Sequence, residues 1–338
     1  MKKKFILRLT GAVSFLIFVI LAVVSGTLRG KLETQQMAER WSEKGGVAQV
    51  SCFFSVNARV TEDSLEEFSH SVDTKLQEAS IVSESPNANA RMWADAYSAN
   101  GQISVQSNRG SITVDAIGIG GDFFLFHPLQ LLSGSYFSGN DLMQDYCILD
   151  QDAAWKLFGS NDVAGQVVYI GQRAHIVTGV IKHEEGRLYD AAGLDSSQIY
   201  VSYQTLEKYG SNNGINHYEI VMPNPVEGFA RSYVEEAIGV NVLEREVVEN
   251  SSRYSLMNRI RHIGELATRS MNGKAIIYPY WENVARAYED ILAILTLFEL
   301  LFLAFPVIII IGAAVYRWKH RTWTVKGVLM RLRGGKIK

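Results

Sequence analysis

The sequence reads Leu132-Ser-Gly-Ser-Tyr-Phe-Ser-Gly-Asn-Asp141, then Tyr146-Cys-Ile-Leu-Asp150, Ala153-Ala-Trp-Lys-Leu-Phe-Gly159, Asp162-Val-Ala-Gly-Gln-Val-Val-Tyr-Ile-Gly171 and His175-Ile-Val-Thr-Gly-Val-Ile181. Short apolar runs rich in β-formers predict strands at 146–149, 167–170 and 175–181. Between the first two of these, the spacing of alanine, leucine and phenylalanine predicts a helix from Gln151 to Phe158. This part of the chain is therefore expected to be rich in short strands and turns.

The aromatic residues and glycines of this run have structural roles in the prediction. Phe137, Leu157 and Phe158 are expected to anchor the core, and Gly134 opens a Gly-x-x-Phe turn. Gly159 is expected to end the helix, while Gly165 and Gly179 allow tight turns, because glycine adopts backbone angles that other residues avoid. These residues indicate a fold and no catalytic site.

Strand–helix–strand patterns lie on both sides of this β-rich part. On the N-terminal side, Val47 to Val56 reads as a strand, Thr61 begins a helix, and 91–97, 103–106 and 111–119 read as strands. On the C-terminal side the sequence predicts a strand at 217–222, a helix at 226–238 and a strand at 241–247. The predicted fold is α+β, a split βαβ lobe (29–121 and 214–250) with an inserted β-rich lobe (122–213).

Two apolar runs, at 10–28 and 291–316, are each long enough to span a bilayer. Residues 1–9 precede the first run, and 317–338 follow the second. The first run is interpreted as a retained anchor; the alternative is a cleaved signal peptide, because Lys2-Lys3-Lys4 resembles its basic start. Helical stalks are predicted next to both spans, at 32–44 and within 251–290.

Charge divides the chain into basic ends and an acidic middle. All 35 acidic residues lie between Glu33 and Glu299, whereas every Asp, Glu, Lys or Arg residue within 2–29 and 317–338 is basic. Lys and Arg collect on the cytoplasmic side of membrane spans. The pattern predicts a two-pass protein of the cell membrane, with both termini cytoplasmic and the large domain extracytoplasmic. The basic ends suit membrane lipids, and the acidic domain argues against nucleic-acid binding.

Glu299 is the one acidic residue inside a predicted span. Charges at this depth are costly and often mark function or assembly. Because the first span offers only hydroxyls, such as Ser14 and Ser25, a partner on another subunit is one interpretation. The other is a carboxyl near the outer interface. Pro306 is expected to kink the same helix, and Glu299 with Pro306 is the candidate intramembrane assembly site.

The two cysteines, Cys52 and Cys147, both lie in the predicted exported domain, where a disulfide is permitted. Two separate buried thiols are the alternative. Nothing in the sequence places their strands side by side.

Signatures of catalysis and of cofactor binding are missing from the sequence. It contains no Gly-x-x-x-x-Gly-Lys-Ser/Thr loop and no Gly-x-Ser-x-Gly elbow, and His183-Glu184-Glu185 lacks the second histidine of a zinc helix. We therefore expect no enzyme activity, no cofactor and no metal in this chain.

The pattern quoted at the outset resembles the MacB-like periplasmic core domain of ABC-type permeases with FtsX-like membrane regions. With both spans and stalks, the resemblance covers about residues 5–316. It implies an extracytoplasmic porter-like lobe with an inserted β-rich lobe. It also implies that ATP is hydrolysed by a cytoplasmic ATPase, separate or fused, and that the stalks transmit the movement for export or mechanotransmission.

The sequence departs from that family by ending after the second span, where such permeases usually continue to four. The basic tail, 317–338, is predicted to form an amphipathic helix on the membrane surface. The alternative is a docking segment for an ATPase or a companion permease, built on Arg317, Trp318, Lys319, Arg321 and Trp323.

The first functional hypothesis is a permease-like subunit of an ABC system, assembled with a partner ATPase and a companion or identical permease chain. The alternative is a membrane-anchored extracellular binding or regulatory module that works without an ATPase. An exported enzyme of unrecognised type is a third and weaker hypothesis.

Overall fold

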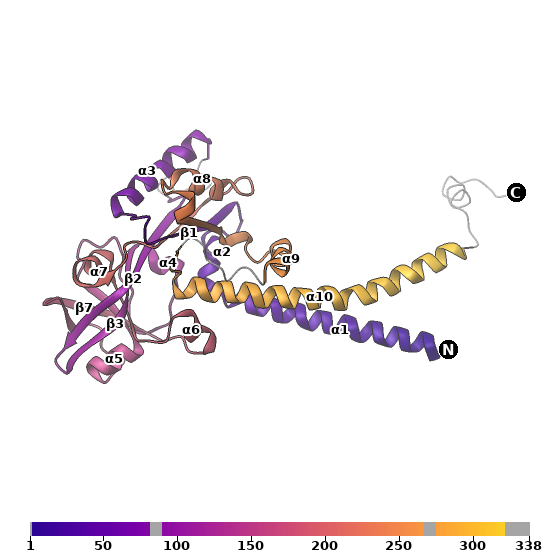
Figure 1. Ribbon diagram of the computed structural model, residues 1–338, viewed down its shortest axis with the longest axis horizontal. Helices are drawn as coiled ribbons and strands as arrows, with labels where there is room; N and C mark the ends of the chain where they lie inside the picture. The colour runs from indigo at the N-terminus through magenta and orange to yellow at the C-terminus, as the bar shows by residue number, and fades with distance from the viewer. Residues whose placement is uncertain (1, 82–89, 267–274, 322–338) are drawn as a thin grey trace. The chain divides into compact units, whose positions relative to one another are not determined.

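The computed structural model describes residues 2–81, 90–266 and 275–321, and it divides into two compact units. The first comprises Met1–Leu28 and Ile291–Lys338, and the second comprises Arg29–Asp290 (Figure 1). Each unit is described below by itself. They correspond to the predicted pair of spans and the predicted domain between them.

The first unit consists of two long apolar helices. They belong to α1 (Lys2–Gly30) and α10 (Tyr280–Lys319), which contain the predicted spans 10–28 and 291–316. Both are long and apolar enough to cross a membrane, and only 11% of each apolar segment is buried. A core helix of a soluble domain would bury a full stripe of its surface, so this exposure favours the membrane interpretation.

The buried positions of α1 recur at heptad spacing. Gly11, Ser14 and Ser25 are buried, and the outward positions between them are exposed. Across from Gly11 lies Ile309 of α10, whose Cδ1 would be 3.0 Å from a Cβ added to the glycine. Small residues of this kind let two helices in lipid approach closely. The two helices of this unit therefore pair along a narrow stripe.

The second unit contains one 11-stranded sheet. Its strands are β1 (Val47–Phe54), β2 (Ala94–Ser107), β3 (Gly110–Gly121), β4 (Leu131–Gly134), β5 (Tyr146–Asp150), β6 (Val167–Ile170), β7 (Arg173–Ile181), β8 (Gln198–Ser202), β9 (Ser211–Asn212), β10 (His217–Pro223) and β11 (Arg245–Glu249).

Its helices are α2 (Met37–Trp41), α3 (Glu62–Glu78), α4 (Phe123–Phe126), α5 (Gln151–Phe158), α6 (Arg187–Ala192), α7 (Tyr203–Tyr209), α8 (Phe229–Ala237), α9 (Leu256–Glu265) and the start of α10, with 3-10 turns η1 (Glu33–Gln35), η2 (Val242–Glu244) and η3 (Asn250–Ser252). The mixed α+β architecture, with one long apolar helix before the domain in the sequence and one after it, is as predicted.

The sheet connects the predicted lobes without a break. Its order is β11-β1-β10-β2-β3-β8-β5-β7-β4, with β6 and β9 pairing to the side. Strands β11, β1, β10 and β2 pair antiparallel, and all four come from the split lobe. Strand β3 then pairs in parallel with β8, which belongs to the predicted insertion. The lobe boundaries at 121 and 213 stay predictions.

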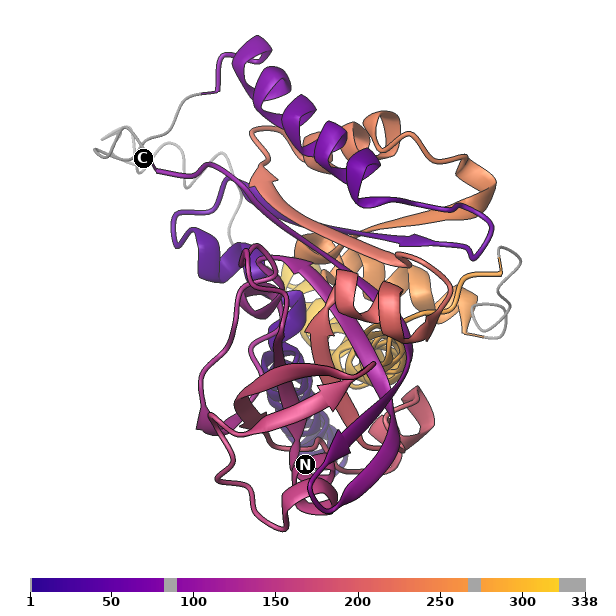
Figure 2. The same ribbon diagram turned by 90° about the vertical axis from the view of Figure 1, so that its left-hand side faces the viewer.

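Helices α3 and α8 cover one face of the β1–β10–β11 part of the sheet (Figure 2). Thr61 caps α3 as predicted, and its apolar stripe, Leu65, Phe68, Val72 and Leu76, is buried against the sheet. The ring of Phe68 stacks on Tyr233 of α8 at 5.8 Å. Full burial of such side chains is worth about 1.5–3 kcal/mol each, so this face forms the main core of the domain.

Two predicted stalk helices are corrected by the structure. Within 32–44 only α2, five residues long, is α-helical, because backbone groups of this segment bond to a glutamine side chain of β1 (below). Within 251–290, η3, α9 and α10 are separate elements instead of one helix. Residues 267–274 lie outside the described part.

The structure also shows that the two cysteines, both described, do not form the disulfide that the sequence permits. Cys52 and Cys147 lie within the described residues, and each is a buried thiol instead of half of a disulfide. Cys52 is in β1 and Cys147 in β5, with β10, β2, β3 and β8 between them in the sheet order. A disulfide needs Cα atoms within about 7 Å, whereas each strand step is about 4.8 Å. Burial raises the pKa of the Cys147 thiol.

Candidate functional site

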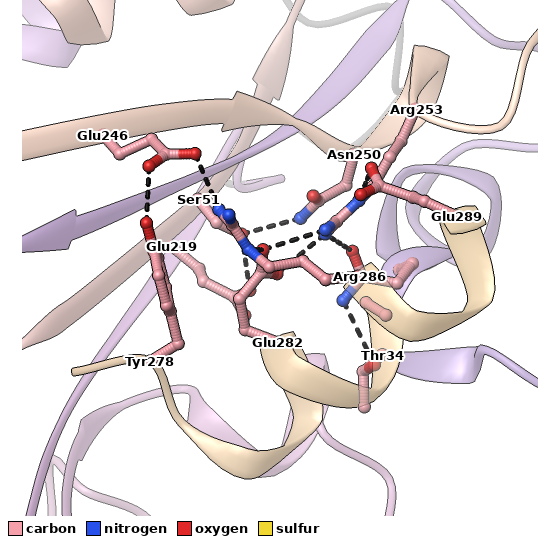
Figure 3. A network of polar contacts seen from close by, with 12 residues as sticks. Thr34, Ser51, Glu219, Glu246, Asn250, Arg253, Tyr278, Glu282, Arg286 and Glu289 are labelled. Atoms are coloured by element: carbon pink, nitrogen blue, oxygen red, sulfur yellow. Dashed lines mark hydrogen bonds and ion pairs between the residues drawn. The ribbon is translucent and has the colours of Figure 1, made fainter. Parts of the chain in front are cut away.

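The face of the sheet opposite α3 and α8 carries a cluster of polar residues that are mostly buried, which we call the root cluster. Its members are Gln35, Gln49, Ser51, His127, His217, Glu219, Glu246, Arg253, Glu282, Arg286 and Glu289. It arises from the two-residue period of the strands. In β1, Ala48, Val50 and Cys52 face the main core, so Gln49 and Ser51 face the other way. The neighbouring strands place Glu219 and Glu246 on that same face. The start of α10 covers them (Figure 3).

Arg253, directly after η3, is the centre of the root cluster. Its guanidinium donates to both carboxylate oxygens of Glu282, at 2.7 and 2.8 Å, and Nε donates to Glu289 at 2.6 Å. The exposed fractions of these three side chains are 2%, 1% and 5%. A fork of this kind gives both strength and fixed geometry. Burial alone would lower the pKa of Arg253, but Glu282 raises it above its usual value.

Arg286 extends the root cluster to β11. It donates to Glu282 and to Glu246, both at 2.6 Å, and its guanidinium lies 3.9 Å from the centre of the Tyr278 ring. The Tyr278 hydroxyl donates to the other oxygen of Glu246 at 2.5 Å. Because Glu282, Arg286 and Glu289 recur at i, i+4 and i+7, they share one face of α10.

The segment that follows α1 is bound to the same sheet face. Gln49 of β1 accepts a hydrogen bond from the Met37 backbone N–H at 2.9 Å and donates to the Thr34 carbonyl at 2.8 Å. Gln35 accepts from Arg253 at 2.9 Å. Residues that come directly after α1 and residues that begin α10 therefore meet at one guanidinium.

A second part of the root cluster surrounds Glu219 of β10. Its carboxylate accepts from Ser51 at 2.7 Å and lies 3.0 Å from His127 Nε2 and 3.2 Å from His217 Nε2. The Trp281 ring of α10 lies against both imidazoles, with centroids 4.6 and 5.5 Å away. The start of α10, which belongs to the domain, is thus held by ionic contacts and by aromatic packing.

Burial controls the ionisation around Glu219. It lowers the pKa of His127, which favours the neutral imidazole. Burial alone would raise the pKa of Glu219, but the two adjacent histidines lower it, and the carboxylate stays ionised. The Ser51 hydroxyl donates to one oxygen of this anion, and an imidazole nitrogen lies within 3.2 Å of each oxygen.

The root cluster has the properties of a mechanical joint. The side chains of Arg253, Glu282 and Glu289 are buried, which closes them to a substrate, whereas Arg286 and Glu246 at the edge are 24% and 32% exposed. Among the described residues, no group of three or more His, Cys, Asp or Glu is arranged to hold a metal ion. What the geometry does is fix the segment after α1 and the start of α10 to one face of one sheet.

Most predicted fold residues lie where the sequence placed them. Gly159 ends α5 with φ +73°, Gly134 and Gly165 have φ +75° and +85°, and Phe137 and Leu157 are buried. Phe158 is half-buried against the main core. The turn predicted at Gly179 is wrong, because this residue lies inside β7. Glycine allows close approach there, since a Cβ would be 2.9 Å from the Ser135 carbonyl oxygen of the adjacent segment.

Glu299 has a partner within the same chain. The Ser25 hydroxyl of α1 donates to its carboxylate at 2.5 Å, and both side chains are buried. One of the hydroxyls of the first span is therefore a partner, so the contact does not require another subunit, which was one of the two interpretations. A role of Glu299 in assembly stays a prediction.

Pro306 lies inside α10, which is continuous from Tyr280 to Lys319. Proline has no N–H, so it cannot donate to the carbonyl of residue 302. In this structure the Ser14 hydroxyl of α1 donates to the Phe302 carbonyl at 2.7 Å. A neighbouring hydroxyl therefore satisfies the oxygen that the proline leaves open, as expected for a helix in lipid.

The predicted docking residues lie at the end of α10. The helix continues through Arg317, Trp318 and Lys319, and the Arg321 guanidinium stacks over the exposed Trp318 ring at 3.8 Å. Trp323 and the rest of the predicted tail helix lie outside the described residues. Whether these residues dock a partner stays a prediction.

The sequence interpretation missed the root cluster. A usable signal was present: Glu282, Arg286 and Glu289 share one helical face directly before an apolar segment. Gln49 and Ser51 likewise alternate with apolar residues in a predicted strand.

Comparison with known proteins identifies the family of the chain. The family model described as the MacB-like periplasmic core domain matches residues 11–238. The chain belongs to this family. The match includes α1 and most of the MacB-like domain, and it ends at the C-terminus of α8, before β11 and α10.

Two curated relatives are macrolide export ATP-binding/permease proteins named MacB. The protein from Chromobacterium violaceum is 25% identical over 163 residues, which is 48% of this chain and 24% of the relative. The one from Agrobacterium fabrum is 29% identical over 119 residues, covering 34% and 18%. The matched part is thus about a quarter or less of each relative's length.

Two solved structures are also similar. The periplasmic region of MacB from Actinobacillus actinomycetemcomitans covers 68% of this chain and 95% of its own, with 15% identity and a TM-score of 0.40. The extracellular domain of the noncanonic ABC-type transporter YknZ covers 59% and 99%, with 17% identity and a TM-score of 0.38.

Proposed function

We propose that this chain is a permease-type membrane subunit of an ABC system. Its MacB-like domain lies outside the cell membrane and both termini are cytoplasmic. A partner ATPase hydrolyses ATP, and the helices α1 and α10 transmit the resulting movement to the domain, for export or mechanotransmission. A companion or identical permease chain completes the assembly, because two helices alone do not enclose a pathway.

The root cluster is the observation that supports this function. Arg253 contacts Gln35, which follows α1, and Glu282 and Glu289, which begin α10. A simple tether does not require both connections to be fixed at one buried point. A device that transmits force does, because a loose joint would absorb the displacement.

The first experiment is purification of the full chain in mild detergent through an affinity tag, with mass spectrometry of the proteins retained. We expect an ATPase that contains a phosphate-binding loop, together with a second permease chain. Repeated recovery of this chain alone, in good yield, would contradict the proposal and favour an anchored binding or regulatory module.

The second experiment measures coupling in the recovered complex. ATP turnover in lipid nanodiscs is compared for the wild type, Arg253→Met and Arg231→Met. Arg231 is half-exposed on α8 and pairs with Glu235 on the surface, so it is a matched control. We expect Arg253→Met to change turnover and Arg231→Met to leave it unchanged. Equal turnover in all three would mean that the root cluster does not transmit the movement.

A further inference from the structure

Helix α9 has its polar side toward its own domain and its apolar side outward. Asn258 donates to the Ser252 carbonyl at 2.8 Å, and His262 lies 3.7 Å from Glu289 of α10. Leu256, Met257 and Ile260 are exposed, at 54%, 69% and 39%. The structure describes all ten residues of α9, and none of them is buried. A surface helix in water normally has the opposite orientation, with its apolar stripe toward the core.

The helical periodicity of α9 places its apolar residues together on one face. With 3.6 residues per turn, Leu256, Ile260 and Ile263 lie in line, and Met257 lies beside them. Arg259 and Arg261 fall on the two flanks of this apolar face. Glu265, the one acidic residue of the helix, lies on the polar side, 3.2 Å from His262. The outward face is therefore apolar with basic edges.

The contact between α9 and the start of α10 indicates what covers this apolar face. Its contact residue Glu289 is two residues before Ile291, where the apolar part of α10 begins. Figure 1 shows α9 beside the first part of α10. A helix with Leu, Met and Ile on one face and Arg at its edges is the type that lies in the interface of a bilayer. Its basic flanks complement anionic headgroups.

We propose that α9 is a membrane-surface helix that docks on the outer leaflet, inserts Leu256, Met257 and Ile260 into the lipid, and prefers anionic phospholipid. This contact would fix the level of the root cluster relative to the bilayer through His262 and Glu289. The inference requires no ATPase and stands or fails separately from the proposed function.

The experiment uses the full chain in vesicles of phosphatidylcholine, with or without phosphatidylglycerol. Met257→Cys carries an environment-sensitive fluorophore, and Leu142→Cys is the control, because Leu142 is 100% exposed in the β-rich part of the domain. The native cysteines are 0% exposed, which keeps background labelling low. We expect blue-shifted emission from the Met257→Cys label, quenched by brominated lipid, and aqueous emission from the Leu142→Cys label.

Lipid composition provides the second arm. Arg261→Glu in the Met257→Cys protein should reverse the blue shift in phosphatidylglycerol vesicles and change it little in pure phosphatidylcholine. Aqueous emission at both labelled positions would overturn the proposal. A blue shift that brominated lipid does not quench, and that grows with protein density, would overturn it in favour of a second copy of this chain as the cover.

Discussion

Arg253 and Glu282 form a buried ion pair joined by two parallel hydrogen bonds, 29 residues apart in the sequence. The pair connects the end of the sheet region to the first turn of a 40-residue helix. Such pairs contribute little net stability compared with apolar packing, but removal of one partner leaves an uncompensated buried charge. The pair is therefore a fixed joint that tolerates little change.

The first prediction concerns the loss of this joint. Arg253→Met should lower the free energy of unfolding by about 3–5 kcal/mol, because the Glu289 carboxylate stays buried without the guanidinium and Glu282 keeps only its contact with Arg286. Arg253→Lys should also be destabilising, since an ammonium group cannot reproduce the fork. The measurement is urea unfolding of the full chain in detergent. Arg231→Met should cost about 0.3–0.5 kcal/mol, as for exposed helix pairs. Equal costs at the two positions would contradict the account.

The second prediction concerns the helix pair. Ser14→Ala should cost about 0.6 kcal/mol, a typical value for a hydrogen bond between helices in a membrane. In a Pro306→Ala background the cost should shrink, because the new backbone N–H can donate to the Phe302 carbonyl. A double-mutant cycle of unfolding in detergent measures the difference. The same cost in both backgrounds would mean that Ser14 does not compensate for the proline.

Glu299 gives a third prediction, on assembly. Glu299→Leu removes the acceptor for Ser25 and should reduce recovery of the partner ATPase and permease in affinity purification. Glu299→Gln keeps an acceptor oxygen at the same position and should retain most of it. If Glu299→Leu retained full recovery, the residue would serve the pairing of α1 and α10 alone.

The fourth prediction concerns pH. Burial lowers the pKa of His127 below its ordinary 6.5, so below pH 6.5 the unfolded chain binds a proton that the folded chain resists. Stability should therefore fall as the pH decreases from about 7.5 to about 5.5. The ionisable groups around His127 are Glu219, His217 and Arg40; the lowered pKa of Glu219 acts only below this range.

The matched variant for that measurement is His127→Gln, which keeps a donor toward Glu219 and does not titrate. Its stability should fall less over the same pH range, although His175, whose pKa burial also lowers, retains some dependence. Identical slopes in the two proteins would show that His127 does not titrate during unfolding.

Local patterns were sufficient to predict several elements. The bounds of β6 and α5 agree with the sequence prediction. Both ends of α5 have a local signal, because Asp150 caps its N-terminus and Gly159 ends it. In β2, by contrast, two predicted strands are one strand of 14 residues. Gly101, between the two predicted strands, allows close approach of a neighbouring segment, since a Cβ there would be 2.2 Å from the Ser211 carbonyl oxygen.

The root cluster could not be predicted from local patterns. Its members come from distant segments, and the contact between Gln35 and Arg253 joins residues 218 apart. The predicted stalk at 32–44 failed for the same reason: Gln49 binds the Thr34 and Met37 backbone groups that a longer helix would have used. Tertiary contacts of this kind override local helix propensity.

The topology of the chain decides the whole account, and a membrane-impermeant maleimide tests it directly in intact cells. Leu142→Cys reports on the domain, Lys2→Cys reports on the N-terminus, and the native cysteines are buried. We predict that the Leu142→Cys protein is labelled in intact cells and that the Lys2→Cys protein is labelled only after permeabilisation. Labelling of the Lys2→Cys protein in intact cells, or protection of the Leu142→Cys protein until the membrane is opened, would contradict the account.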